Sequence, residues 1–303
     1  MREFKGFLMK IVYALLLTSL FSTASLSQDD LNRLIATESS FVKTAAEHGP
    51  KIAFLEHLAP DAIIFRPQAI NGYEYWKSTQ DRPNDVLVRK AIFADISSNG
   101  LLGYTTGNWR LYEKGKSESS ASYGQYATIW ERKPDGKYRA TLDISIEHDK
   151  LPFTETDRIG RADLTRDLNK RGWSPADASM NFLRMSMKGS VRLGGAYERF
   201  AAKDVRLLIE REPPIIGKKN VVREMARYLA VEFPTKIAAF QAADMAYTWN
   251  PCRFTNNEEG FENGHCLHVW KLRDKKWWIV LGVFARIPND KAPVIKRRPR
   301  NKL

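Results

Sequence analysis

The amino-acid sequence contains an internal repeat, which limits the possible folds more than any other feature of the chain. In both halves a Tyr-Thr pair precedes a segment that runs from glycine to tryptophan, first as Tyr104-Thr105 and 124–130 and again as Tyr247-Thr248 and 264–270. An aspartate that opens an apolar run precedes each copy, at Asp61 and Asp204. A shift of about 140 residues relates the copies, which is much longer than the unit of a solenoid repeat. The sequence therefore predicts two copies of one domain.

The N-terminal segment has the pattern of a secretory signal peptide. Basic residues occur within 1–10, an apolar stretch covers 11–21, and small residues follow up to Ser27. The apolar stretch is too short to span a bilayer. We therefore predict that residues 1–27 are a signal peptide, that the chain has no transmembrane segment, and that the mature protein is exported to the periplasm or the exterior.

The chain is strongly basic, with a formal net charge of +13. Such an excess favours contact with anionic surfaces. Part of it lies in residues 289–303, which we predict to be a disordered basic tail able to contact an anionic surface. Nucleic-acid binding would require aromatic stacking positions among the basic ones or a recognition helix, and an exported protein seldom meets nucleic acid. No nucleic-acid partner is therefore expected.

Each copy begins with helical spacing of apolar residues and ends with strand-like alternation. This order predicts an α+β fold, with helices packed on one face of a curved antiparallel sheet. The segment 71–85 between strands is expected to form a lid or a helix. We place the first domain at 28–149, a charged linker at 150–173 and the second domain at 174–288.

The order of elements resembles a known superfamily. The carrying motifs in the first half are Asp61-Ala62, Phe65-Arg66-Pro67, Gly103-Tyr104-Thr105, 124–130, 135–138 and Leu142-Asp143; the second half matches at Gly217, 246–248, 264–270 and 276–281. These look like the nuclear transport factor 2-like, or SnoaL-like, cone fold, which includes ketosteroid isomerases and polyketide cyclases. Gly282 replaces the aspartate seen at 143, so the second copy departs there. The resemblance implies two cone-shaped domains whose concave sheet faces are roofed by helices. Because this fold hosts many activities, it does not assign one.

Strand alternation groups the candidate pocket residues on one sheet face, which we expect to be concave. With Trp109 from the preceding strand they would form an aromatic lining of the kind that ligand pockets have. The alternative is a filled core made of the same side chains. The candidate pocket residues are Trp109, Tyr126, Thr128, Trp130, His268 and Trp270.

No catalytic group can be assigned by position, but two candidates stand out. His268 lies among aromatic residues, where an imidazole is able to titrate near neutral pH, although a hydrogen-bonded core histidine is the simpler interpretation. Asp143 would serve in the first domain if its side chain points inward, whereas its polar neighbours Thr141 and Ser145 suggest a solvent-facing surface. Asp61 and Asp204 are explained by capping or turns.

No metal site and no cofactor are expected. His265 and His268 are three residues apart on a predicted strand, so their imidazoles point to opposite faces and do not readily share an ion.

The only two cysteines, Cys252 and Cys266, occupy the positions that match Trp109 and Tyr126 in the first copy. In an oxidising compartment this favours a hairpin disulfide over two buried thiols.

Together these features predict an exported protein that binds a small, apolar or mixed-polarity ligand, with two domains packed on each other. The alternatives are a SnoaL-type isomerase, cyclase or hydrolase, and a structural or partner-binding protein whose cavities are filled.

Overall fold

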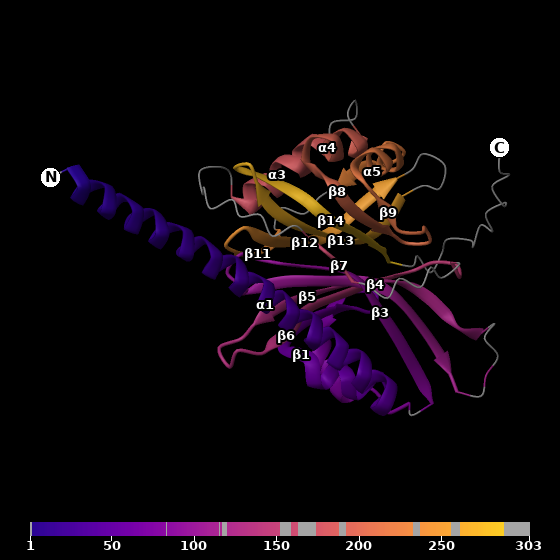
Figure 1. Ribbon diagram of the computed structural model, residues 1–303. Helices are drawn as coiled ribbons and strands as arrows, with labels where there is room; N and C mark the ends of the chain where they lie inside the picture. The colour runs from indigo at the N-terminus through magenta and orange to yellow at the C-terminus, as the bar shows by residue number, and fades with distance from the viewer. Residues whose placement is uncertain are drawn as a thin grey trace.

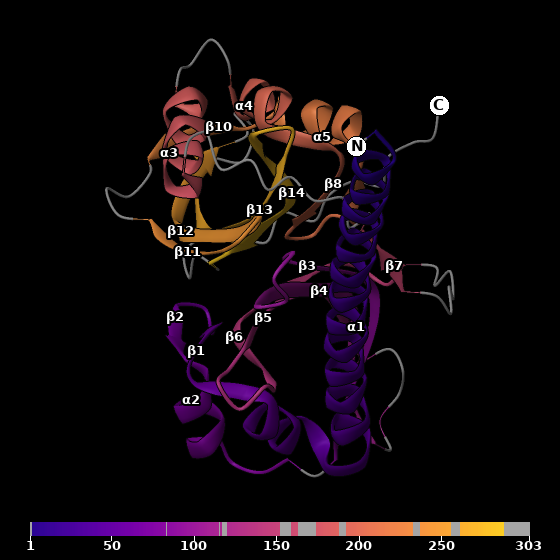
Figure 2. The same cartoon turned by 60° about the vertical axis from the view of Figure 1, so that its left-hand side comes forward.

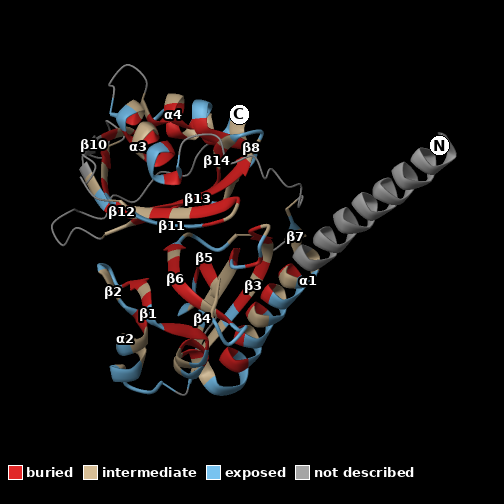
Figure 3. Ribbon diagram, turned by 90° about the vertical axis from the view of Figure 1, so that its left-hand side faces the viewer, coloured by how far each residue is buried: buried red, intermediate tan, exposed pale blue. Residues whose placement is uncertain are grey.

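The computed structural model describes residues 2–287 apart from 83, 115, 117–119, 152–158, 163–173, 188–191, 233–236 and 256–260; the side chains of 2–27, 231, 232 and 261 are also outside the description. The chain forms two α+β domains whose sheets face each other, with helices on the outer sides (Figures 1 and 3). This confirms the predicted fold class. The predicted tail, 289–303, lies outside the described residues.

The first domain consists of α1 (Arg2–His57), β1 (Leu58–Phe65), β2 (Ala69–Asn71), α2 (Gly72–Ser78), β3 (Asp85–Ile96), β4 (Leu102–Glu113), β5 (Ser122–Arg132) and β6 (Tyr138–Glu147). Its strands are ordered β2-β1-β6-β5-β4-β3-β7, where β7 (Gly160–Arg161) comes from the predicted linker. The helix α1 is interrupted at Gly49, whose φ is 84°, and Pro50 follows. Two helical segments are thus joined at a kink. The segment 71–85, expected to form a lid or a helix, contains α2.

The second domain consists of α3 (Pro175–Ser186), α4 (Arg192–Phe200), β8 (Ala201–Ile209), β9 (Ile215–Ile216), α5 (Lys218–Met225), β10 (Leu229–Glu232), β11 (Ala238–Ala242), β12 (Met245–Thr255), β13 (Phe261–Arg273) and β14 (Lys276–Arg286). Its sheet is ordered β10-β12-β13-β14-β8-β9, and β11 also pairs with β12. Figure 2 shows α3, α4 and α5 on the outer face of this sheet. Among the residues that the structure describes, no helix is long and apolar enough to cross a membrane.

The two sheets share irregularities as well as strand order. In each, the first long strand pairs in parallel with the last, β1 with β6 and β8 with β14, so the sheets are mixed rather than wholly antiparallel. Each also has a register shift beside the repeated tryptophan, at Trp130 in β5 and at Trp270 in β13. A bulge of this kind turns the following residues to the other face. The duplication therefore extends to backbone geometry.

The sheet faces that carry no helices pack against each other and form one apolar core shared by both domains. Its buried members include Tyr104, Ile129, Leu142 and Ile144 from the first domain and Met245, Leu267, Val269 and Val283 from the second. The repeated tyrosines both lie at this interface: Tyr104 is one of its buried members, and Tyr247 packs against it. The same position of the repeat thus contributes from both domains, as in an isologous, two-fold-like contact.

One buried cluster of charges crosses this interface. The ammonium group of Lys271 on β13 lies 3.2 Å from a carboxylate oxygen of Asp95 on β3 and 2.6 Å from the backbone oxygen of Ile96. A carboxylate oxygen of Asp244 lies 3.6 Å from the same nitrogen, and the other accepts the backbone N–H of Ser98 at 2.6 Å. Lys271, Asp95 and Asp244 are all buried. Because unpaired charges are costly in the interior, alignments of the two sheets that separate these groups are disfavoured.

Candidate functional site

The helix-facing side of the first sheet carries a tryptophan-threonine-carboxylate chain. The indole N–H of Trp130 donates to the hydroxyl of Thr105 at 2.9 Å, and that hydroxyl donates to Glu38 on α1 at 2.6 Å. The other carboxylate oxygen of Glu38 accepts the hydroxyl of Tyr126 at 2.8 Å. Burial raises the pKa of Tyr126 well above its ordinary value, so the phenol remains a donor. The carboxylate of Glu38 is thereby held in the roof of the sheet by two donors.

Arg89 on β3 connects this hydrogen-bonded chain to Asp143, the candidate catalytic residue of the first domain. One guanidinium nitrogen donates to Asp143 at 2.9 Å and to Thr128 at 2.7 Å, and Thr128 donates to the same oxygen of Asp143 at 2.6 Å. The guanidinium carbon lies 3.5 Å from the ring centre of Tyr126. Burial alone would lower the pKa of Arg89, but the nearby carboxylates of Asp143 and Glu38 outweigh it and raise the pKa above its ordinary value. Arg89 is therefore a permanent cation between two carboxylates.

The structure differs from the expectation that the face of Asp143 meets solvent. Asp143 is buried, and it lies on the helix-facing side with Arg89 and Thr128. The expectation assumed strict alternation through Thr141, but the register shift beside Trp130 interrupts it. Thr141 instead contacts Tyr247 in the domain interface. The polar neighbour that suggested solvent therefore belongs to the opposite face.

Sequence reasoning did not select Glu38 or Arg89, which complete the network. Glu38 lies in an amphipathic helix and Arg89 in a strand with other charged residues, where both resemble surface positions. A signal was available at Glu38: it occupies the buried stripe that runs from Leu34 to Phe41. The hydroxyl groups that donate to its carboxylate, those of Thr105 and Tyr126, come from strands far along the chain.

Two donors in this layer, Nε of Arg89 and Nε1 of Trp76, have no hydrogen-bond partner among the described residues. Both are buried atoms. Aromatic contacts connect their side chains: Arg89 lies over Phe41 at 4.8 Å, Phe41 packs against Phe54 at 4.9 Å, and Phe54 stacks on Trp76 at 4.6 Å. An unmet donor in a buried layer is costly, so an acceptor supplied from outside would be favourable there.

Trp109, the remaining pocket candidate of the first domain, does not join this network. It lies on β4 opposite Gly124, is half-buried, and donates its indole N–H to the backbone oxygen of Gln125 at 3.1 Å.

The second domain repeats the first hydrogen bond of the chain and then departs from it. The indole N–H of Trp270 donates to Thr248 at 2.9 Å, as Trp130 does to Thr105. The helix residue beside Thr248 is Ser179, whose hydroxyl lies 3.4 Å away, instead of a glutamate.

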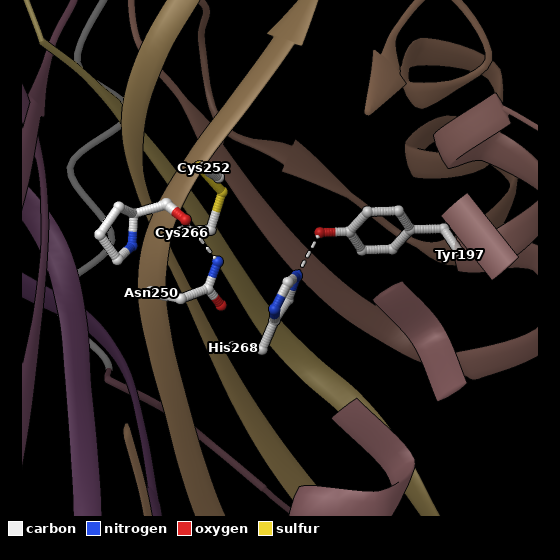
Figure 4. The surroundings of a disulfide bond; sticks show 6 residues. Tyr197, Asn250, Cys252, Cys266 and His268 are labelled. Carbon is white, nitrogen blue, oxygen red and sulfur yellow. Dashed lines mark hydrogen bonds between the residues drawn. A yellow bond between two sulfur atoms is a disulfide. The ribbon is translucent and has the colours of Figure 1, made fainter. Parts of the chain in front are cut away.

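His268 is buried and shares a hydrogen bond of 2.9 Å with the hydroxyl of Tyr197 (Figure 4). Phe182 packs edge-on against the imidazole at 4.9 Å. Burial lowers the pKa of His268 to about 3, so the imidazole is neutral at physiological pH. A Cβ at Gly282 would lie 2.7 Å from the Tyr197 hydroxyl. Tyr197 therefore occupies the space that a side chain matching Asp143 would need.

His265 lies on the opposite face of β13. Its Nε2 is 3.1 Å from the backbone oxygen of Pro67, and its ring packs against Phe65 in the domain interface. The described residues contain no group of three or more His, Cys, Asp or Glu side chains placed to hold a metal ion.

Cys252 and Cys266 form a disulfide with a Cα–Cα distance of 5.9 Å, which confirms the predicted pairing (Figure 4). The strand register places Cys252 opposite Gly264 and Cys266 opposite Asn250, so the bridge joins diagonal neighbours. Both half-cystines belong to the apolar core under the helices of the second domain.

Reduction of this disulfide should lower the free energy of unfolding by about 3 kcal/mol, because the bridge closes a loop of roughly fifteen residues in the unfolded chain. Urea unfolding with and without a thiol reductant measures the difference. The Cys252→Ala/Cys266→Ala variant should show no response to reductant, which makes it the control. A response below about 1 kcal/mol in the unmodified protein would contradict the prediction.

No family model matches the sequence. No curated protein matches it either. The structure is similar to NTF2-like proteins, which match about 40% of this chain. One from Pseudomonas putida KT2440, of unknown function, is 13% identical and has a TM-score of 0.32, with 40% of this chain and 93% of that chain covered. Another of unknown function, from Shewanella oneidensis MR-1, is 17% identical at a TM-score of 0.31, covering 39% and 97%. A third, from Cytophaga hutchinsonii ATCC 33406, is 13% identical at 0.32, covering 38% and 100%.

Proposed function

We propose that the first domain binds a small molecule of mixed polarity in the layer between α1, α2 and its sheet, and that the second domain is a filled, supporting copy. The molecule would present acceptor oxygens to Arg89 and Trp76 and an apolar part to the rings of Phe41 and Phe54. The disulfide and the N-terminal pattern support an exported protein.

The observation that carries the proposal is the difference between the two copies. Where the first has Glu38, Tyr126, Thr128 and Asp143, the second has Ser179, Cys266, His268 and Gly282. The second copy keeps the strand order, the bulge and the Trp-Thr hydrogen bond without any buried charge at these positions.

The fold itself therefore does not require charges in this layer. Burying an ion pair with its partners is at best neutral for stability compared with an apolar replacement. Charges that are present in one copy only are better explained by a bound ligand. In ligand sites, a few polar groups in fixed positions determine the orientation of the ligand.

Native mass spectrometry on protein exported to a bacterial periplasm tests the proposal. The unmodified protein should retain a small molecule that is released on denaturation. A neutral-site variant with Glu38→Gln, Arg89→Met and Asp143→Asn should fold and lose it. A control variant with Glu47→Gln, Lys43→Met and Asp135→Asn removes the same charges from exposed positions and should keep it.

Equal occupancy in the neutral-site variant would place the ligand elsewhere and overturn the proposal. A protein that carries no ligand and binds nothing in a metabolite library would favour the structural interpretation. If the retained molecule exchanges deuterium at a carbon beside a carbonyl, and the neutral-site variant abolishes the exchange, the first domain is an isomerase-type enzyme.

A further inference from the structure

The outer rim of the second domain carries a lysine whose ammonium group contacts a backbone oxygen and two aromatic rings, but no carboxylate of the described residues. Lys276, at the start of β14, donates to the backbone oxygen of Arg199 at 2.8 Å. Its ammonium lies 3.8 Å from the ring centre of Trp278 and 5.8 Å from that of Phe200. Two aromatic faces and one carbonyl thus fix the ammonium while its remaining N–H groups stay available.

Two further cations converge on the same place. The ammonium of Lys218, the first residue of α5, lies 5.9 Å from the ring centre of Trp278. The guanidinium of Arg199, in the last turn of α4, is exposed and close enough to interact electrostatically with Lys276. Only Lys218 has a carboxylate in reach, that of Glu198 at 3.4 Å, and Glu198 is itself exposed. Within the described residues, neither Arg199 nor Lys276 forms an ion pair.

The cluster therefore holds unbalanced positive charge. Burial lowers the pKa of Lys276, and the charges of Arg199 and Lys218 lower it further. A bound anion would relieve this repulsion and raise the pKa of Lys276 again.

We propose that Arg199, Lys218 and Lys276 form a binding site for a phosphate or sulfate oxyanion over Trp278. Lys276 is held in place by its carbonyl and ring contacts, and Arg199 and Lys218 add charge-assisted donors beside it, a set that suits the several oxygens of an oxyanion. The site is on the rim of the second domain, away from the layer around Arg89. This proposal is therefore independent of the function proposed for the first domain. The oxyanion belongs either to a free ion or to a polyanionic polymer.

Calorimetric titration at low salt with two probes, inorganic phosphate and linear polyphosphate, tests the site and separates the two sources. Binding of both probes indicates a free oxyanion site, and binding of polyphosphate alone indicates a polymer. The Arg199→Gln/Lys276→Met variant should bind about tenfold more weakly or worse. Lys276→Arg should retain binding, because arginine keeps the positive charge at this position, and the double variant should unfold in urea at the same midpoint as the unmodified protein.

The matched control is Arg33→Gln/Lys43→Met, which removes one arginine and one lysine from exposed positions on α1. It should bind as the unmodified protein does. Equal weakening in the control, or no binding of either probe by the unmodified protein, overturns the proposal. A nuclear magnetic resonance titration gives a second measurement: the pKa of Lys276 should rise on addition of the bound probe and stay constant if attraction is merely diffuse.

Discussion

Replacing Lys271 by methionine should lower the free energy of unfolding by about 3–5 kcal/mol, the usual cost of removing one partner from a buried ion pair. The substitution leaves Asp95 and Asp244 facing each other at the domain interface without their shared cation. Burial raises the pKa of Asp95 even with Lys271 present, because Lys271 offsets only part of the cost. Denaturant unfolding at neutral pH, followed by tryptophan fluorescence, measures the loss.

The control for this prediction removes the aspartates as well. The variant Lys271→Met/Asp95→Asn/Asp244→Asn removes every charge of this cluster and should recover most of the stability, because replacing a whole buried ion cluster is often neutral. A loss below about 1 kcal/mol in Lys271→Met alone would show that the cluster is not effectively desolvated.

Acid should destabilise the protein through His268 by up to about 5 kcal/mol between pH 6.5 and pH 3, since one pKa unit corresponds to about 1.4 kcal/mol. The folded-state pKa of about 3 lies below the ordinary value of 6.5, so the neutral imidazole is favoured by folding. The stability that His268 contributes is present above pH 6.5 and is lost as the pH falls through this window.

Comparison with His268→Gln isolates this effect from the carboxylates that also titrate in acid. Glutamine keeps a partner for the Tyr197 hydroxyl but does not ionise. The difference in unfolding free energy between the two proteins should shrink by roughly 2–3 kcal/mol from pH 7.5 to pH 4.5. A difference that stays constant with pH would mean that the imidazole is accessible to water.

The sequence was most informative where a pattern of residues occurs twice. Two copies of a Tyr-Thr pair and a Gly-to-Trp strand predicted two α+β domains, and the positions of Cys252 and Cys266 within the repeat predicted their disulfide. These inferences depend on residues close together on neighbouring strands, where alternation and register determine the contacts.

The charged site was less predictable, because its contacts join distant segments. The residues of the Tyr126–Glu38 hydrogen bond are 88 positions apart in the sequence, and those of the Arg89–Asp143 hydrogen bond are 54 apart. Period-two alternation also failed at Thr141, where the bulge shifts the faces of the strand. Lys271, near the end of a strand, gives the same local pattern as a solvated lysine, and only the packing of the second sheet on the first buries it.

The sheet-to-sheet contact has a consequence for how the protein behaves when it is dilute. Two separate chains with this interface would dissociate as their concentration fell, whereas a short tether keeps the partners at an effective concentration on the order of millimolar. The pairing here is thus independent of the amount of protein present. Because the two halves are separate stretches of one sequence, equivalent positions are also free to differ, as Glu131 and Lys271 do with opposite charges. In a dimer of identical chains, any change at such a position would appear on both sides at once.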